Sequence, residues 1–311
     1  MNVLQALLRR THSPARPCVN GLPGGSVKDK GAKTREQIEE LTIRALAGEI
    51  AALEELVGVL QTDIFNLALQ FLWSPKDAED ATQEILLKIV VNLNRFEFRT
   101  NLRTWAYRIA SNYLIDARRS HAEQRNISFE LIEHELRAPS PEPAETDSSR
   151  LEEQAESVKT ACTHAMLLCL DRPARLAFIF GEVLQLKSNE AAEVLGTTPA
   201  AFRQRLARAR KRMSDFMGRH CGLMDARNSC RCSNRIGYAQ QANRPGRLPY
   251  AAYAECLRQS DALPSIPQFY QKEIDRVHRL ALIYRTNRSY KSPEKLLRRI
   301  VDLVQREHPN P

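Results

Sequence analysis

The stretch DAEDATQEILLKIVVNLNRFEFRTNLRTWAYRIASNYLIDARR (residues 77–119) decides the class of fold. It contains neither Gly nor Pro, and its apolar residues recur at helical spacing. The clearest stripe consists of Ile85, Leu86, Ile89, Val90, Leu93 and Phe96. Because the same low Gly and Pro content extends over residues 34–122, this part of the chain is predicted to be an all-helical block.

A helix start is encoded just before this stretch, in WSPKD (residues 73–77). Ser74 is a good N-cap residue, and Pro75 suits the first turn of a helix. Asp77, Glu79 and Asp80 follow, and acidic side chains are favourable near the positive end of a helix dipole. We therefore expect two helices joined by a tight turn at this point.

A second helical block is predicted from Leu151 to about Gly218. Its last third reads SNEAAEVLG, TTP, AAFRQRLARARKRM, in which Gly196 suits the end of one helix. Thr198 and Pro199 suit the start of the next helix. Two short helices joined by such a turn are typical of a DNA-binding helix-turn-helix motif.

The fold class predicted is all-α, with two helical domains joined by a flexible linker and followed by a helical C-terminal extension. Pro139, Pro141 and Pro143 in RAPSPEPAETDSS disfavour regular helix and indicate the linker. Two amphipathic stripes indicate the helices of the extension: Ile274, Val277, Ala281 and Tyr284, then Leu296, Leu297, Ile300, Val301 and Val304. The predicted boundaries are a disordered leader at 1–33, a first domain at 34–122, the linker at 123–155, a second domain at 156–218 and the extension at 219–311.

The composition favours a nucleic-acid partner. Forty-six Lys and Arg residues against thirty-seven Asp and Glu residues give a formal net charge of +9. No apolar run approaches the roughly 18 residues of a spanning helix, so no membrane insertion is expected. Seven scattered cysteines do not resemble a secreted disulfide framework, which predicts reduced thiols and a cytoplasmic location.

Two segments have the chemistry of nucleic-acid binding. Residues 200–213 carry six cationic side chains and no acid, on a helix whose packing stripe is Phe202, Leu206 and Ala209. Residues 95–120 interleave aromatic side chains with arginines, a combination suited to unstacked bases and a single-stranded backbone. For each aromatic side chain taken singly, a place in the core stripe of one helix is an equally good interpretation.

These segments resemble known sequences. Residues 77–119 resemble region 2 of the sigma-70 family, in its extracytoplasmic-function (ECF) subfamily. Residues 170–213, LDRPARLAFIFGEVLQLKSNEAAEVLGTTPAAFRQRLARARKRM, resemble region 4. The resemblance implies an RNA polymerase sigma factor that binds core polymerase, recognises and melts promoter DNA, and starts transcription, as in stress or envelope responses. Core RNA polymerase and promoter DNA would be its partners, with an anti-sigma factor as a further candidate.

The resemblance also implies three sets of site residues. The core-polymerase set is Asp77, Glu79, Asp80, Gln83 and Glu84. The set for the promoter −10 element is Arg95, Phe98, Arg99, Asn101, Arg103, Thr104, Trp105, Tyr107, Arg108, Asn112, Arg118 and Arg119. The set for the −35 element is Thr198, Ala200, Arg203, Gln204, Arg205, Arg208, Arg210 and Lys211. Arginine can pair with guanine and glutamine with adenine, whereas other cationic groups suit phosphates.

The cysteines after the second domain leave two interpretations open. His220, Cys221, Cys230 and Cys232 could bind zinc or another soft metal, although the C-x-C spacing is not the usual C-x₂₋₄-C. The alternative is an incidental, reduced and oxidisable cluster in an Arg-rich loop, with Cys256 farther along. Cys162 and Cys169 are predicted to be core residues. No cofactor is expected to be required, and the extension is expected to be regulatory.

Catalysis is not expected. The sequence has no Gly-rich phosphate loop, no G-x-S-x-G motif and no H-E-x-x-H motif. A helix-turn-helix transcriptional regulator with a metal- or redox-sensing C-terminal domain is the alternative function. That alternative leaves the acidic helix start at 77–84 and the aromatic segment at 95–119 without a role.

Overall fold

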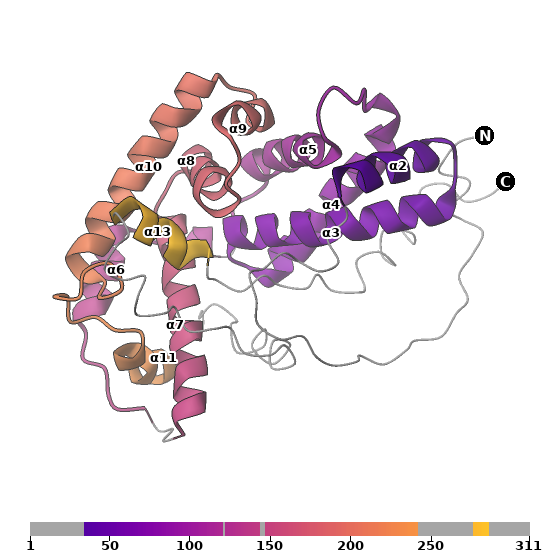
Figure 1. Cartoon of the computed structure of the whole chain (residues 1–311). Coiled ribbons are helices and arrows are strands. Elements are labelled where there is room, and N and C mark those ends of the chain that lie inside the picture. The colour runs from indigo at the N-terminus through magenta and orange to yellow at the C-terminus, as the bar shows by residue number, and fades with distance from the viewer. Residues whose placement is uncertain (1–33, 121, 144–146, 242–275, 286–311) are drawn as a thin grey trace.

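The computed structural model describes residues 34–120, 122–143, 147–241 and 276–285. Within these ranges every regular element is a helix, as predicted (Figure 1). The leader at 1–33, Cys256 and the second predicted helix of the extension, around Leu296 to Val304, lie outside the described residues.

The first group of helices is α2 (Arg35–Leu46), α3 (Ile50–Leu72), α4 (Pro75–Asn92) and α5 (Leu102–Asp116). Between α3 and α4, Trp73 adopts a left-handed conformation with φ of 49°, and this residue ends α3. The Ser74 side chain then accepts a hydrogen bond from the backbone N–H of Asp77. The predicted turn between two helices is therefore confirmed at WSPKD.

A short connection leads from α4 to α5 and carries several of the predicted DNA-binding residues. It begins with the single turn η1 (Leu93–Arg95) and runs through residues 96–101. The Asn101 side chain accepts a hydrogen bond from the backbone N–H of Thr104 at 2.7 Å and so caps α5. This cap sets the direction in which α5 leaves the connection.

The segment predicted as a flexible linker contains regular structure. It includes the turn η2 (Glu123–Arg125), the helix α6 (Phe129–Arg137) and the first residues of α7 (Ser148–Leu168). Ser128 caps α6, and the ring of Phe129 packs on that of Phe216 with 5.0 Å between centroids. The prolines at 139–143 lie just after α6, where they end the helix without preventing it from forming.

The second group consists of α7, α8 (Arg172–Phe178), η3 (Ile179–Val183), α9 (Ser188–Val194) and α10 (Pro199–His220). Gly196 has φ of 59° and follows the end of α9, and Thr198 caps α10 by accepting a hydrogen bond from Ala201 N–H. The predicted helix-turn-helix is therefore present as α9 and α10. An added Cβ at Gly181 would lie 2.5 Å from Leu206 Cδ2, so this glycine lets η3 approach α10 closely.

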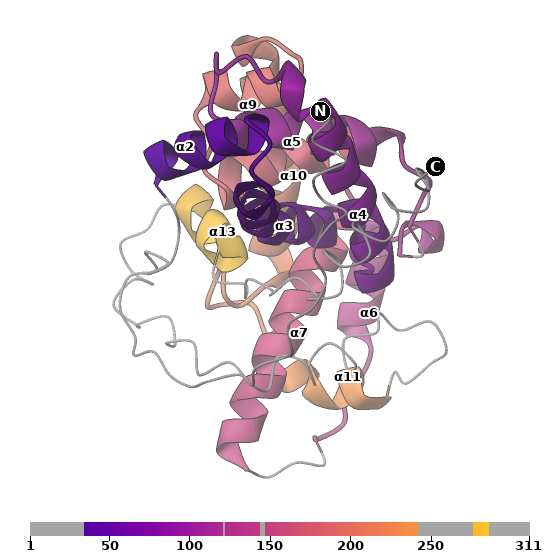
Figure 2. The ribbon, with the colours of Figure 1, turned by 90° about the vertical axis from the view of Figure 1, so that its right-hand side faces the viewer.

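The two groups pack on each other, and a single hydrophobic core runs through both. Helix α5 packs against α8 and α9, and α3 packs against α7 and α8 (Figures 1 and 2). Two separately tethered domains were the expectation from sequence. The structure shows instead one continuous packed body in the described part of the chain.

The C-terminal extension contributes η4 (Ser233–Arg235), α11 (Ile236–Gln241) and α13 (Arg276–Arg285). Figure 2 shows α11 against the N-terminal part of α7, where Gln240 donates a hydrogen bond to Gln154 at 2.9 Å. Helix α13 lies on η3 and α10, and the Tyr284 ring contacts Phe178 with 4.9 Å between centroids. This helix includes Ala281 and Tyr284 of the first stripe predicted in the extension.

Candidate nucleic-acid interface

Helix α10 presents a cationic face to solvent. Phe202, Leu206 and Ala209 are buried beneath it, as the sequence pattern predicts. The residues exposed on the outer side are Ala200, Arg203, Gln204, Ala207, Arg208, Lys211 and Arg212. Within the first three turns this surface offers two guanidinium groups and one amide, and its other exposed residues, Ala200 and Ala207, are small. Such a surface can enter a major groove.

Two of the predicted −35 residues have partners within the protein. The Arg210 guanidinium pairs with the carboxylate of Glu182, whose side chain is only 3% exposed. Arg210 therefore ties α10 to η3 rather than extending freely toward a phosphate. Lys211 pairs with Asp215 at 2.8 Å on the exposed surface. Arg205 is half-buried, and Thr198 serves as the N-cap.

An aromatic platform lies in the connection between α4 and α5. Phe98 is 40% exposed and has φ of 56°, a conformation that bulky residues adopt only when their surroundings hold them in it. Its ring contacts Phe96 with 4.7 Å between centroids, and Phe96 contacts Trp105 at 5.5 Å. The exposed Arg95 and Arg99 flank this platform. The chain thus presents an aromatic ring beside cationic groups, which suits an unstacked base.

Four further predicted −10 residues are exposed: Arg108 and Asn112 on α5, and Arg118 and Arg119 just after its end. Two other predicted −10 residues have structural roles. Asn101 caps the helix, and Arg103 donates a hydrogen bond to Asp63 at 2.9 Å. These two residues position the surface, whereas the four exposed residues can contact a nucleic-acid backbone directly.

Thr104 and Tyr107 do not lie on the exposed surface. The Thr104 hydroxyl donates a hydrogen bond to Glu190 on α9 at 2.9 Å, and the residue is 3% exposed. The Tyr107 ring packs on Phe180 of η3 with 5.6 Å between centroids, and burial raises the pKa of its phenol far above the ordinary value of 10.0. In this arrangement the second group of helices covers both residues.

The predicted core-polymerase residues lie along α4. Asp80 and Glu84 are exposed and one turn apart, and Asp77, Glu79 and Gln83 are half-buried beside them. Burial raises the pKa of Tyr113 on α5, and the carboxylates of Glu84 and Asp80 raise it further. Helix α4 packs against α5, and the two exposed acids, one turn apart on α4, form a negative patch.

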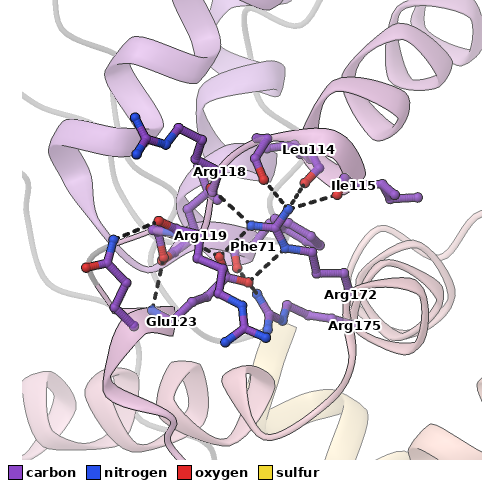
Figure 3. Close-up of polar contacts among 12 residues, drawn as sticks. Phe71, Leu114, Ile115, Arg118, Arg119, Glu123, Arg172 and Arg175 are labelled. Atoms are coloured by element: carbon purple, nitrogen blue, oxygen red, sulfur yellow. Dashed lines mark hydrogen bonds and ion pairs between the residues drawn. The ribbon is translucent and has the colours of Figure 1, made fainter.

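A buried ion cluster, which sequence analysis did not find, joins the two groups of helices (Figure 3). Arg172 donates hydrogen bonds to the carbonyl oxygens of Leu114 and Ile115, at the end of α5, and pairs with Glu123 at 2.7 Å. Arg175, 3% exposed, donates to the Phe71 carbonyl oxygen at 2.6 Å and pairs with Glu123 at 2.9 Å. One carboxylate therefore holds two arginines that satisfy the ends of α3 and α5.

Acid is expected to weaken the protein through Glu123. Burial alone would raise the pKa of this carboxyl. The hydrogen bonds from Arg172 and from Ser120 N–H, together with the charges of Arg175 and Arg172, outweigh burial and lower the pKa to about 2. The resulting stability, about 3 kcal/mol, is complete above the ordinary value of 4.5 and is lost as the pH falls toward 2. Urea unfolding at a series of pH values measures this loss.

The matched variants for this pH dependence are Glu123→Gln and Glu97→Gln. Glu97 is 63% exposed in an ion pair, so Glu97→Gln should keep the acid-dependent loss of stability. Glu123→Gln should flatten the pH profile between about pH 5 and pH 2. An unchanged profile in Glu123→Gln would contradict the assignment of this loss to Glu123.

The predicted metal ligands are not all neighbours. The His220 ring packs on Phe216, with 4.8 Å between centroids, and its Nε2 lies 3.8 Å from a Glu133 carboxylate oxygen. Cys221, Cys230 and Cys232 lie in the loop after α10. In the described ranges, no three His, Cys, Asp or Glu side chains already surround a common point that a metal ion could occupy.

No described helix combines the length and the apolar character required to cross a bilayer.

Comparison with known proteins places both candidate surfaces inside matched segments. Residues 56–124 match the profile of Sigma-70 region 2, and residues 160–213 match that of Sigma-70, region 4. The first segment contains α4 and α5, and the second contains α9 and most of α10. Their order along the chain is the one predicted from the sequence.

Individual relatives agree with these matches. The "Probable RNA polymerase sigma-C factor" of Mycobacterium bovis is 29% identical over 180 residues, covering 58% of this chain and 90% of the relative. "ECF RNA polymerase sigma factor SigG" of Mycobacterium tuberculosis is 33% identical over 152 residues, covering 44% of this chain and 41% of the relative. The "RNA polymerase sigma-H factor" of Pseudomonas aeruginosa is 28% identical over 187 residues, covering 57% of this chain and 92% of the relative.

Proposed function

Because this chain is a sigma factor of the sigma-70 family and of the extracytoplasmic-function type, acting in transcription initiation, we propose that it recognises promoters in two parts. In this proposal α10 reads the −35 element, and the surface formed by residues 95–101 and α5 opens and holds the −10 element. The chain acts as a binding subunit of the polymerase in the cytoplasm and catalyses no reaction itself.

One observation carries this assignment: a single chain exposes a cationic helix for duplex DNA and, separately, an aromatic platform flanked by arginines. A regulator that only binds duplex DNA needs the first surface and has no use for the second. Phe98 supplies the second surface, since its ring is exposed and its backbone is held in an unfavourable conformation. Opening a duplex removes base stacking, and an aromatic ring can replace part of that stacking.

The acidic patch on α4 supports binding to core polymerase. Asp80 and Glu84 are exposed on a helix in the segment that matches region 2, and the formal charge of the whole chain is positive. A negative patch on a basic protein does not contribute to DNA affinity, because it repels phosphates. It suits a positively charged protein surface, which we assign to core polymerase. An anti-sigma factor would be expected to cover the same patch.

Linking two DNA-binding surfaces has a quantitative consequence. Each surface alone makes mostly phosphate contacts, which are weak in specificity and depend strongly on salt. When one chain on one polymerase carries both surfaces, binding of the first promoter element holds the second surface at a high effective concentration near the second element. Specific recognition is therefore expected to require the polymerase complex and two elements at a fixed separation.

Run-off transcription tests the proposal. Purified core polymerase and a pool of promoter fragments would be incubated with and without the full chain at a stated salt concentration. Transcripts that depend on the chain and share two spaced upstream elements would support the proposal. If the chain bound duplex DNA tightly but neither bound the core enzyme nor produced a transcript, the chain would be a conventional helix-turn-helix regulator.

Replacing Phe98 with alanine is expected to reduce the fraction of open promoter complex about tenfold, because stacking a base on an aromatic ring contributes about 1–3 kcal/mol. Core binding should not change, since Phe98 lies apart from the α4 patch. Permanganate reactivity of unpaired thymines measures opening. Ile43→Ala is the matched control, because Ile43 is also an exposed apolar residue, 58% exposed, and lies on α2. Equal opening by both variants would remove Phe98 from the mechanism.

A further inference from the structure

The C-terminal extension holds the end of α6. Arg235, the last residue of η4, donates hydrogen bonds to the carbonyl oxygens of Glu135 and Ala138, both at 2.7 Å. Ala138 is the C-cap residue of α6, so a cationic group of the extension binds carbonyl oxygens at the negative end of this helix. The Arg235 guanidinium also lies over the Tyr238 ring, 4.2 Å from its centroid, which fixes the direction of the arginine side chain.

The contact continues along the proline-rich segment that follows α6. Helix α11 comes directly after η4, and the Tyr238 N–H donates a hydrogen bond to the Ser140 hydroxyl at 3.0 Å. Gly237 is buried, and a Cβ added there would lie 1.8 Å from the Pro141 carbonyl oxygen. Because that oxygen belongs to the backbone, only glycine lets α11 lie this close. Residues 138–141, predicted to be part of a flexible linker, are therefore held by the extension.

The extension is itself anchored to the second group of helices. Both η4 and α11 pack on α7, and Figure 1 shows α11 at the end of α7 that lies farthest from α2 and α3. A compact loop connects α10 to η4. In it the Asn228 amide donates hydrogen bonds to the carbonyl oxygens of Gly218 at 3.0 Å and Cys221 at 3.1 Å. Arg231 donates another to the Ala226 carbonyl oxygen at 2.8 Å. The extension thus links α10 firmly to the segment after α6.

Helix α6 also belongs to the second group. It packs on α7 and α10, and the Arg212 guanidinium of α10 lies 5.6 Å from the Phe129 ring centroid. At the other end of α6, a Glu133 carboxylate oxygen lies 3.8 Å from His220 Nε2. With α6, α7, α10 and α11 held together, the chain passes between the two groups of helices at residues 117–128. This joint lies before the segment to which the sequence assigned flexibility.

We propose that the C-terminal extension is an intramolecular clip that positions the two DNA-binding groups. Arg235, Gly237 and Tyr238 hold residues 135–141 against the second group, so the groups can separate only by movement of residues 117–128. The clip thereby limits the distance between the surfaces that contact the two promoter elements. Its three residues are positioning residues. The effect on promoters rests on the function proposed above, whereas the clip itself does not.

Release of the clip has a calculable effect on promoter recognition. The segment between α6 and α7 would join residues 117–128, which about doubles the length of chain free to move between the groups. The effective concentration of a tethered surface falls roughly as the −3/2 power of linker length. Transcription at the best spacing of the two elements should therefore fall about two- to threefold, while relative output at other spacings should rise. A mere loss of folded protein would instead lower output at every spacing by the same factor.

Amide hydrogen exchange of the full chain tests the clip without polymerase. Mass spectrometry would follow peptides that cover residues 133–142. In Arg235→Ala the exchange of these peptides should become at least about tenfold faster, because two hydrogen bonds from a charged group are lost. Arg227→Ala is the matched control, since Arg227 lies in the same extension but is 90% exposed and pairs with Asp225. Its exchange over residues 133–142 should equal that of the wild type.

Gly237→Ala separates release of the clip from loss of helix. Alanine is a better helix former than glycine, so this change alone would favour α11. The contact with the Pro141 carbonyl should nevertheless force α11 away and speed exchange over residues 133–142, as in Arg235→Ala. Gly58→Ala on α3 is the control, because a Cβ at Gly58 meets open space. Wild-type exchange in both Arg235→Ala and Gly237→Ala would overturn the proposal.

Transcription from promoters whose two elements are separated by one base pair more or less at a time tests the positioning role. The wild type and Arg227→Ala should share one sharp optimum, and Arg235→Ala and Gly237→Ala should both give a broader one. Circular dichroism would establish that each variant is folded. Faster exchange with an unchanged spacing profile would overturn the positioning role. If the wild type gave no transcript from any promoter, the function proposed above would be wrong, and the exchange rates would still decide whether the clip exists.

Discussion

Replacing Arg175 with methionine is expected to lower the free energy of unfolding by about 3–5 kcal/mol, the usual loss when one member of a buried ion pair is removed. Arg175 is 3% exposed and donates hydrogen bonds to the carbonyl oxygens of Phe71, Leu167 and Leu170. Methionine fills much of the same volume but leaves these oxygens without their donor and removes one of the two arginines paired with Glu123. Urea unfolding followed by circular dichroism measures the change.

The control for Arg175→Met is Arg118→Met. Arg118 is also an arginine close to this cluster, but its side chain is exposed, so the control should change stability by no more than about 0.5 kcal/mol. The double variant Arg175→Met with Glu123→Gln should be more stable than the sum of the single losses predicts, because it removes both charges together. Strict additivity would show that the two residues do not stabilise the protein as a pair.

Removing Arg203 and Arg208 together is expected to reduce promoter-dependent transcription at least about 30-fold, since each contact to a base or phosphate contributes about 1–3 kcal/mol. Both side chains are exposed on α10, on either side of Gln204. Replacement with alanine keeps a good helix former at each position, so α10 should persist. The measurement is run-off transcription with core polymerase over a range of promoter concentrations.

Salt dependence shows what kind of contact each arginine makes. The slope of log affinity against log salt should fall by about one for each phosphate contact removed. Arg219→Ala is the control, because Arg219 is an exposed cation on the same helix about 16 Å beyond Arg208 along the axis. If Arg219→Ala reduced transcription as much as the double variant, net charge and not the α10 surface would explain the effect.

Local signals explain what the sequence predicted well. The turns at Ser74 and Thr198 were predicted because each cap bonds to a backbone N–H three residues away. Likewise, the buried stripe of α10 follows from helical spacing alone. Such features depend on a few consecutive residues, and a single sequence contains all the information that they require.

Contacts between distant residues explain what was missed. Arg175 reaches the Phe71 carbonyl 104 residues away, and nothing near either residue indicates this bond. In the sequence, Arg210 cannot be distinguished from the other cationic residues of α10. It forms an ion pair with the buried Glu182 because the fold brings Glu182 next to it. By contrast, Cys162 and Cys169 were predicted to be core residues, and both pack against the hydrophobic core.

The covering of Thr104 and Tyr107 has a consequence for the balance between free and bound protein. The −10 role predicted for Thr104 and Tyr107 would require DNA to take the positions that Glu190 and Phe180 occupy, so under that prediction packing and DNA contact at this point exclude each other. For every 1.4 kcal/mol by which the packed form is favoured, the share of free chains able to use these two residues falls tenfold. A partner that holds α9 and η3 away from α5 would remove this penalty, and promoter affinity would rise without any new contact to DNA.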